Sequence, residues 1–315
     1  MTKKRTEYDN PWKEIIEDFF PSFLEFFFPA VYSIIDWTKS YEFLDSELQK
    51  LEPDAEIGKR LVDKVAKVFL LNGEEAWILV HVEVQSQYDK NFPERMFIYH
   101  YRLFDRHKTK VISLAVLADE QANWRPSSYG YSLGECRLSL EFPVVKLLDY
   151  ESQWQTLEQT TNLFSIVVMA HLRTKATNQN PESRLQWKLR LVRMLFEKGY
   201  SREEIIGLFR FIDWLMSLPE ELAADFKAEL KREEEAGRMR YVTSIERLAK
   251  QEGKVENARE SVIEVLEARF GKIPSDALES INCINDISVL KSLLRDATTI
   301  SSMEAFVELV NETNL

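Results

Sequence analysis

Hydrophobic and polar residues form their clearest pattern between residues 63 and 85, where two apolar runs flank a short polar turn. The first run reads DKVAKVFLL and the second reads AWILVHVEVQ. Both are rich in the β-branched and aromatic residues that are typical of strands. The Asn72-Gly73 pair between them is a strong hairpin signal. We therefore predict a β-hairpin with a three-residue loop at residues 72–74.

This loop would place Asp63 directly opposite Glu83, and opposed residues of a hairpin share one face of the sheet. Alternation along the second run puts Gln85 on the same face as Glu83. Two carboxylates held close together repel each other unless a hard cation lies between them, and magnesium prefers oxygen ligands. The pattern predicts a site for Mg²⁺, or for Mn²⁺ or Ca²⁺, held by Asp63 and Glu83. The alternative is that both residues are ordinary strand ends that face solvent, and a loop of another length would place Asp63 on the other face.

The run LVDKVAKVFLLNGEEAWILVHVEVQSQYDKNFPERMFIYHYRLFDRH, followed by VISLAVLADE and FPVVKLLDY, resembles the bacterial recombination-promoting nuclease and putative transposase family. This family is a branch of the PD-(D/E)XK nuclease superfamily, and the similarity covers residues 10–172. The resemblance implies a mixed β-sheet flanked by helices, with metal-dependent cleavage of DNA phosphodiesters. It places the motif aspartate at Asp63, the motif carboxylate at Glu83, and Gln85 where most of the superfamily has lysine. Relatives in this branch are similar in having glutamine there, although an amide brings no charge.

Superfamily members often add a glutamate from the helix that precedes the first strand. In SYEFLDSELQKL, three leucines form one apolar helical face and Glu47 borders it. Glu47 is therefore a candidate third metal ligand, and Glu42 is a competitor. The alternative is a solvated acid at the edge of the helix.

A second helix is predicted directly after the candidate catalytic strand, in the run PERMFIYHYRLFDRH, because Pro93 suits a first helical turn. Arg95 and Arg102 flank its apolar stripe, and Lys90 lies just before it. A nuclease needs cations along the phosphate track, so these three residues are candidate DNA contacts. The alternative is that the arginines are simply the solvated face of this helix.

Composition limits the other possibilities. The 315-residue chain has a net charge of −11, which opposes DNA binding at long range, but much of the acid lies beyond Glu203. Two cysteines and no signal peptide favour the cytoplasm. The aromatic run at residues 19–29 is too short to cross a membrane and predicts an amphipathic helical segment packed over the sheet. The sequence has no phosphate-binding glycine loop and no GxSxG elbow.

The predicted fold is α/β, with a mixed sheet flanked by helices in a restriction-endonuclease-like core at residues 1–173. Further strands are predicted at 110–117 and 137–147, with a loop at 122–134 and a helix at 157–172. Beyond the core, we expect a helical hairpin at 181–219 and a charged helical extension with a C-terminal module at 220–315. In the extension, Val255, Ala258, Val262 and Val265 have a spacing compatible with a heptad seam. The C-terminal helices are thus candidates for homo-oligomer formation, and the alternative is a solvated helix.

The function expected from these residues and this resemblance is a metal-dependent DNA endonuclease, linked through the family to recombination or mobile elements. The rival hypothesis is an inactive protein that kept the nuclease fold as a binding or assembly module. Gln85, the acidic charge and the helical tail favour that rival. Cleavage of RNA by the same centre is a third possibility.

Overall fold

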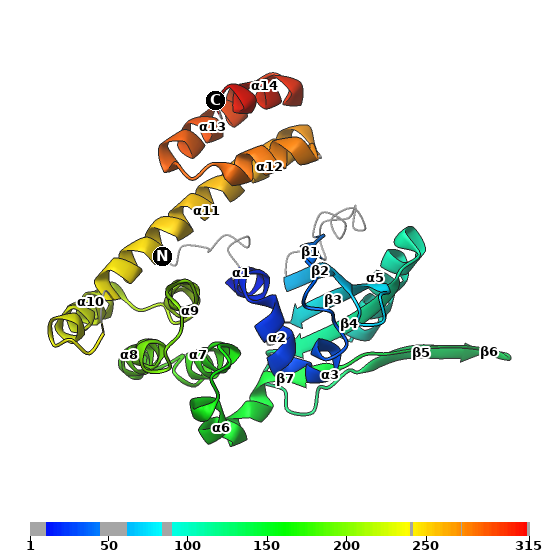
Figure 1. The fold of residues 1–315 in the computed structure, drawn as a ribbon, viewed down its shortest axis with the longest axis horizontal. Helices are drawn as coiled ribbons and strands as arrows, with labels where there is room; N and C mark the ends of the chain where they lie inside the picture. The colour runs from blue at the N-terminus through cyan, green and yellow to red at the C-terminus, as the bar shows by residue number, and fades with distance from the viewer. Residues whose placement is uncertain (1–10, 45–61, 84–89, 240–241, 272, 314–315) are drawn as a thin grey trace. The chain divides into compact units, whose positions relative to one another are not determined.

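The computed structural model of the chain describes residues 11–44, 62–83, 90–239, 242–271 and 273–313. Within them the architecture is mixed α/β, with a five-stranded sheet, a separate two-stranded ribbon and many helices (Figure 1). The chain forms two compact units, one spanning Asn10–Met239 and a helical one that begins at Arg240. The first unit contains both sheets.

The central sheet combines antiparallel and parallel neighbours. Its strand order is β1-β2-β3-β4-β7, in which β2 is antiparallel to both β1 and β3, and β4 is parallel to both β3 and β7. The strands are β1 (Glu42–Phe43), β2 (Val62–Phe69), β3 (Glu75–Glu83), β4 (Lys110–Leu117) and β7 (Val144–Lys146). The predicted hairpin is therefore present as β2 and β3, and β4 has the predicted bounds.

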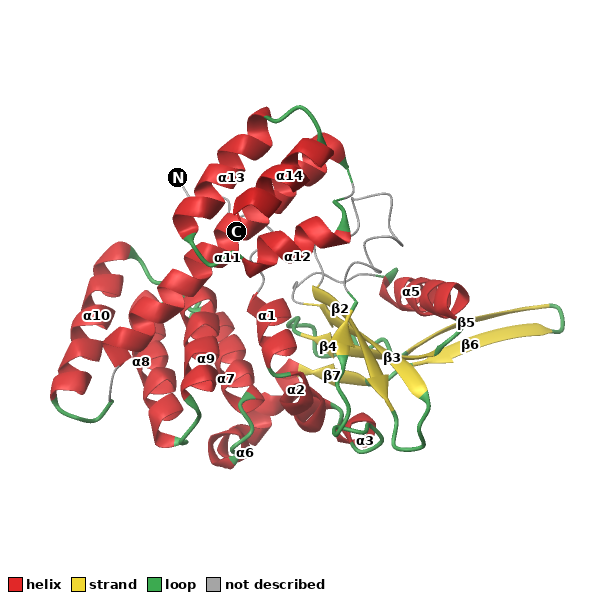
Figure 2. Ribbon diagram, turned by 45° about the horizontal axis from the view of Figure 1, so that its top comes forward, coloured by secondary structure: helices red, strands yellow, loops and turns green. Residues whose placement is uncertain are grey.

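Helix α5 (Phe92–His107) connects the parallel strands β3 and β4 and covers one face of the sheet (Figure 2). Its side chains Tyr99 and Leu103 pack against Val65, Trp77 and Leu79 of the hairpin. The predicted proline lies in the first turn of this helix, where an N–H group has no partner within the helix. The helix therefore lies directly over the face that carries the odd-numbered residues of β2 and β3.

Helices of the N-terminal segment lie on the opposite face of the sheet (Figure 2). The aromatic run that was predicted as an amphipathic segment forms the second of these helices and buries four of its apolar side chains. Phe23 in this helix makes an edge contact with Phe164 at 5.4 Å between ring centroids. These helices are α1 (Pro11–Asp18), α2 (Phe20–Phe27) and α3 (Pro29–Tyr32).

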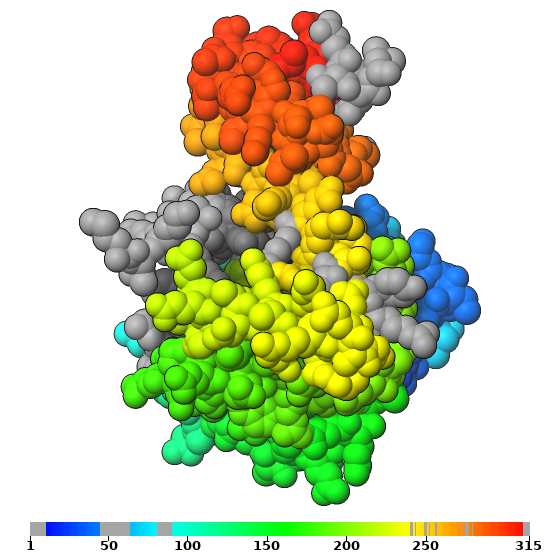
Figure 3. All heavy atoms as spheres, turned by 90° about the vertical axis from the view of Figure 1, so that its left-hand side faces the viewer, coloured from blue at the N-terminus to red at the C-terminus, as the bar shows by residue number. Residues whose placement is uncertain are grey.

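The remaining helices of the first unit follow the sheet in sequence. They are η2 (Leu147–Gln153), α6 (Trp154–Gln159), α7 (Phe164–Ala176), α8 (Pro181–Glu197), α9 (Arg202–Leu215) and α10 (Glu220–Glu235). The predicted capping box is present, because the Ser201 and Glu204 side chains and backbone N–H groups bond reciprocally. Helices α8 and α9 contact α7, and α10 packs on α8, so that α8 and α10 lie on one face of this unit (green to yellow-green in Figure 3). The helices predicted as a separate hairpin at 181–219 thus share a unit with the sheet.

A two-stranded ribbon, β5 (Ser128–Leu133) with β6 (Cys136–Glu141), forms the second sheet. It lies where the sequence predicted a loop at 122–134 and a single strand at 137–147. That expected strand is interrupted at Pro143, and its two halves join different sheets. The helix expected at 157–172 is likewise divided into α6 and α7. Pro143 explains the first interruption, since proline cannot donate to a sheet ladder.

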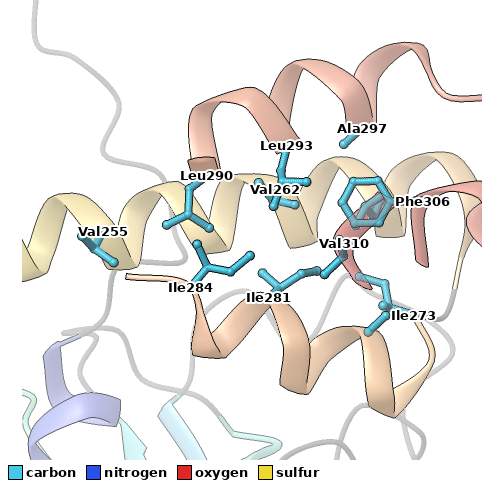
Figure 4. Close-up of a cluster of buried hydrophobic side chains, with 12 residues drawn as sticks. Val255, Val262, Ile273, Ile281, Ile284, Leu290, Leu293, Ala297, Phe306 and Val310 are labelled. Atoms are coloured by element: carbon cyan, nitrogen blue, oxygen red, sulfur yellow. The ribbon is translucent and has the colours of Figure 1, made fainter. Parts of the chain in front are cut away.

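The second unit is built from helices around its own hydrophobic core (Figure 4). Val255 and Val262 are buried in this core, and Ala258 and Val265 pack against it. The positions predicted as a heptad seam are therefore covered by helices of the same chain, which removes the basis for oligomer formation through that seam. The helices are α11 (Val242–Phe270), α12 (Ser275–Cys283), α13 (Ile287–Thr299) and α14 (Met303–Thr313).

No helix among the described residues is both long enough and apolar enough to cross a bilayer.

Candidate active site

The candidate site lies at one edge of the central sheet, where the parallel strands end. Glu83 at the end of β3 is in register with Leu117 of β4, which is in register with Lys146 of β7. Asp63 lies near the start of the antiparallel strand β2 and pairs with His81 of β3, so it belongs to the same edge. In open α/β sheets, ligands bind outside the carboxyl ends of parallel strands. This edge is therefore where a site is expected from the fold.

The register of the β2–β3 hairpin differs from the predicted register by two residues. Asp63 pairs with His81 and not with Glu83. The loop consists of residues 71–73, because the Leu70 N–H donates to the Glu74 carbonyl at 2.8 Å. The loop thus has the predicted length but begins one residue earlier.

A shift of two residues leaves the face of every side-chain position unchanged, because the side-chain period of a strand is two. Glu83 lies two residues beyond His81 in β3, so Asp63 and Glu83 occupy diagonal positions on one face. Diagonal neighbours on antiparallel strands have Cα atoms about 7–8 Å apart. Val65 and Leu79, which follow the same alternation, pack against α5. The two acidic positions therefore lie on the face that α5 covers.

The structure describes the backbone of Asp63 and Glu83, whereas their carboxylates lie outside its described part. Glu47 and Gln85 lie wholly outside the described residues. Among the side chains that the structure does describe, no group of three His, Cys, Asp or Glu is placed to hold a metal ion. The side chains of the proposed metal ligands Asp63, Glu83 and Glu47 lie outside this described set.

The predicted cationic residues are distributed along α5 and just before it. Phe92, at the start of the helix, packs against Leu117, so this end of α5 lies near the candidate edge. Arg95 is half-buried, with its guanidinium carbon 5.5 Å from the centroid of the Phe92 ring. Lys90 and Arg102 are exposed, and Arg102 lies two turns further along the helix. Of the three predicted cations, Lys90 and Arg95 are therefore closer in sequence to the start of α5, which lies near the candidate edge, than Arg102 is.

A buried ion pair that the sequence did not predict lies at the same edge. Lys146 Nζ is 2.8 Å from each carboxylate oxygen of Asp119 and 3.2 Å from the Trp124 carbonyl oxygen. The two charged side chains are 0% and 1% exposed. An ammonium group has three donors, and three acceptors surround the Lys146 ammonium. Lys146 therefore does not take the role of the motif lysine, whose position in this chain is occupied by Gln85. A charged residue at the end of each of two apolar runs, VISLAVLAD and FPVVK, is the signal that would have revealed the pair.

A pocket of about 280 Å³, lined by both apolar and charged residues, lies beside this ion pair. Its lining includes the Ala118 carbonyl, which accepts hydrogen bonds from His171 Nε2 at 3.0 Å and Lys175 Nζ at 2.5 Å. Burial, together with the nearby Lys175 ammonium, lowers the pKa of His171 to about 4. The histidine is therefore neutral at pH 7 and carries its proton on Nε2, since a carbonyl can only accept. Burial also lowers the pKa of Lys175.

Comparisons of the chain with protein-family models, with curated proteins and with solved structures find no match.

Proposed function

We propose that the chain is a metal-dependent DNA endonuclease whose active site lies at the edge of the sheet that carries Asp63 and Glu83. The observation that supports this proposal is the β2–β3 register, which gives two acidic residues diagonal positions on one face at the ends of neighbouring strands. A hairpin slipped by a single residue would have separated them onto opposite faces. The proposal includes a restriction-endonuclease-like core, which the mixed sheet and the β3–α5–β4 crossover support.

The donor set suits a hard divalent cation, because two carboxylates supply charged oxygen ligands and magnesium prefers such ligands. Asp63 and Glu83 would hold Mg²⁺ or Mn²⁺, with Glu47 as a further ligand. A bound ion of this kind lowers the pKa of a water molecule and stabilises negative charge on a phosphate. Gln85 would orient the attacking water or a phosphate oxygen through its amide group.

The cations of α5 would hold the DNA. Lys90 and Arg95 would contact phosphates near the cleaved bond, and Arg102 would contact the backbone further away. The chain carries a net charge of −11, so these local contacts must overcome repulsion at long range. We therefore expect weak binding that falls steeply as the salt concentration rises. A role in recombination or with mobile elements follows only from the family resemblance.

The test is nicking of a supercoiled plasmid in the presence of Mg²⁺ or Mn²⁺. Asp63→Ala and Glu83→Ala should each lower the nicking rate on the order of 100-fold or more, because even residues that only support metal ligands cost 10–100-fold when lost. Glu75→Ala is the matched control. Glu75 lies on β3 at the opposite end from Glu83, on the same face, and it pairs with Lys67 at 2.9 Å. Its substitution should leave the nicking rate unchanged.

Nicking that survives both Asp63→Ala and Glu83→Ala would contradict the proposal. If the wild-type protein cleaves neither DNA nor RNA but binds DNA in a fluorescence anisotropy assay, the protein is instead a binding module with a nuclease fold. Preference for RNA in parallel assays would keep the site and change the substrate.

A further inference from the structure

The ribbon formed by β5 and β6 extends beyond the five-stranded sheet and has two chemically different faces (Figure 2). One face carries Tyr129, Tyr131 and Leu133 of β5 opposite Leu140, Leu138 and Cys136 of β6. The other face carries Ser128, Gly130 and Ser132 opposite Glu141, Ser139 and Arg137. Alternation of this kind is typical of a sheet that buries one face.

The base of the ribbon is partly buried against the rest of the unit. The Tyr129 ring stacks on Phe97 of α5 at 5.1 Å between centroids, and Leu140 packs against a buried cluster that includes Phe92. Toward the tip, Tyr131 is 52% exposed and Leu133 is 78% exposed. An isolated two-stranded ribbon is marginally stable in water and needs further strands or packing against a helix. Tyr129 at the base has such a contact with α5, whereas Tyr131 and Leu133 are exposed.

The outer edge of β6 presents backbone groups that β5 does not use. The Phe142 N–H donates to the Ser127 carbonyl at 2.9 Å, which makes this pair a hydrogen-bonded pair of the antiparallel ladder. Such pairs alternate with non-hydrogen-bonded pairs. Leu140 and Leu138 are therefore bonded to β5, while the N–H and C=O groups of Arg137, Ser139 and Glu141 point away from it. All three of these residues are exposed.

We propose that β6 pairs antiparallel with β6 of a second copy of this chain, about a twofold axis through Ser139. This register places Ser139 opposite its own equivalent and Arg137 opposite Glu141 of the second copy. All outward-pointing groups of these residues then bond across the interface. Leu138 lies opposite Leu140 of the second copy on the apolar face. The result is a four-stranded sheet in the order β5-β6-β6-β5.

The choice of a second copy rests on the charges of this edge. A twofold axis at Ser139 brings together two pairs of opposite charge and two pairs of leucines, all from a single six-residue strand. Opposite charges directly across an antiparallel pair are stabilising, and like charges there are destabilising. Charged side chains on an edge strand normally oppose self-pairing, whereas the two charges of this strand have opposite signs and lie at symmetric positions. A net charge of −11 makes two copies of the chain repel each other at long range. A surface for self-association therefore requires local charge complementarity of this kind.

The interface is small. A single strand edge buries less surface than a standard interface, which buries about 800 Å² on each partner. We therefore expect a dimer that dissociates with a micromolar constant, and not a permanent one.

Sedimentation velocity of the full-length protein over a range of concentrations tests this proposal. Ser139→Pro removes an outward N–H from β6 without removing a bond to β5, so it should abolish dimer formation. Ser132→Pro is the matched control, because the backbone N–H of Ser132, which lies opposite Arg137, points outward from the β5 edge of the ribbon. The control should dimerise like the wild type. Loss of dimers in Ser132→Pro with retention in Ser139→Pro would overturn the proposal, as would a wild-type protein that stays monomeric at the highest concentrations.

A charge exchange tests the register itself. Arg137→Glu and Glu141→Arg should each raise the dissociation constant about tenfold or more, because each creates two pairs of like charge across the axis. The double variant Arg137→Glu/Glu141→Arg restores opposite charges and should restore dimer formation. A double variant that is as weak as the single variants would contradict pairing about Ser139. Circular dichroism of each variant checks that the fold is retained.

Discussion

At the scale of single residues, charge buried at the candidate edge is neutralised by close partners. Asp119 and Lys146 are almost completely inaccessible, and the Asp119 carboxylate also accepts a hydrogen bond from the Gln121 N–H at 2.8 Å. This pair fixes the segment after β4 against β7. It therefore holds two of the strands that end at the edge where Glu83 lies.

Removal of one partner of this pair should be strongly destabilising. We expect Asp119→Ala to lower the free energy of unfolding by about 3–5 kcal/mol, because it leaves a buried ammonium without a counter-charge. Urea unfolding of the first unit measures this change. Asp105→Ala is the control, since its partner Lys108 and Asp105 itself are 70% and 59% exposed, and it should cost less than about 1 kcal/mol. Equal losses in the two variants would show that the buried pair contributes no more than a surface pair.

His171 should make stability depend on pH. Its pKa is about 4 in the folded chain, against about 6.5 for an unperturbed histidine, so the unfolded state binds the proton more tightly. The contribution of the neutral side chain is complete above pH 7 and falls as the pH drops toward 4, by about 2 kcal/mol at pH 5. Urea unfolding of the wild type and of His171→Gln at pH 7.5 and pH 5 isolates this effect. The loss caused by the substitution should be smaller at pH 5, and an equal loss at both values would be inconsistent with a buried neutral histidine.

At the scale of elements, the sequence predicted the hairpin because its two strands and its turn carry strong local signals. The loop was placed one residue too late because the apolar run continues to Leu71, which is 67% exposed in the turn. A three-residue hairpin loop usually ends with its left-handed residue, and Gly73 has φ +86°. A three-residue loop that ends at Gly73 consists of residues 71–73, and this loop gives the observed register. The ribbon strand β5 was missed because its serines and glycine are also typical of loops.

Substitution of Gly73 tests how firmly the turn sets this register. Gly73→Ala should lower the free energy of unfolding by about 1–2 kcal/mol, because a residue with a Cβ atom resists the left-handed conformation. A Cβ atom there would meet no atom within 4 Å, so the cost is conformational and not steric. Gly73→Asn should cost less, because asparagine tolerates this conformation. Equal costs for alanine and asparagine in urea unfolding would contradict this explanation.

At the scale of the whole molecule, the chain divides near Met239 into two units with separate cores. The sequence placed divisions after residues 173 and 219, because polar, turn-rich or charged segments begin there. In the structure, residues 10–239 pack together as one unit. Arg193 of α8 reaches Glu233 of α10 at 2.9 Å, which joins α10 to the first unit. Long-range contacts of this kind have no local signature in the sequence.

A fragment of residues 242–315 should therefore fold alone. Its core includes Val262, Leu266, Leu293 and Phe306, which are all at most 2% exposed. We expect a helical circular dichroism spectrum and cooperative thermal unfolding. A spectrum typical of an unfolded chain would show that the core of the second unit is insufficient by itself.

The central claim is that Asp63 and Glu83 bind one divalent cation at the edge of the sheet. Anomalous scattering from crystals soaked in Mn²⁺ tests it most directly. The account predicts one strong peak within about 2.2 Å of an oxygen atom of each carboxylate, as expected for a small divalent cation with oxygen ligands. Asp63 and Glu83 carboxylates directed to opposite sides of the sheet, with manganese bound elsewhere or nowhere, would contradict it.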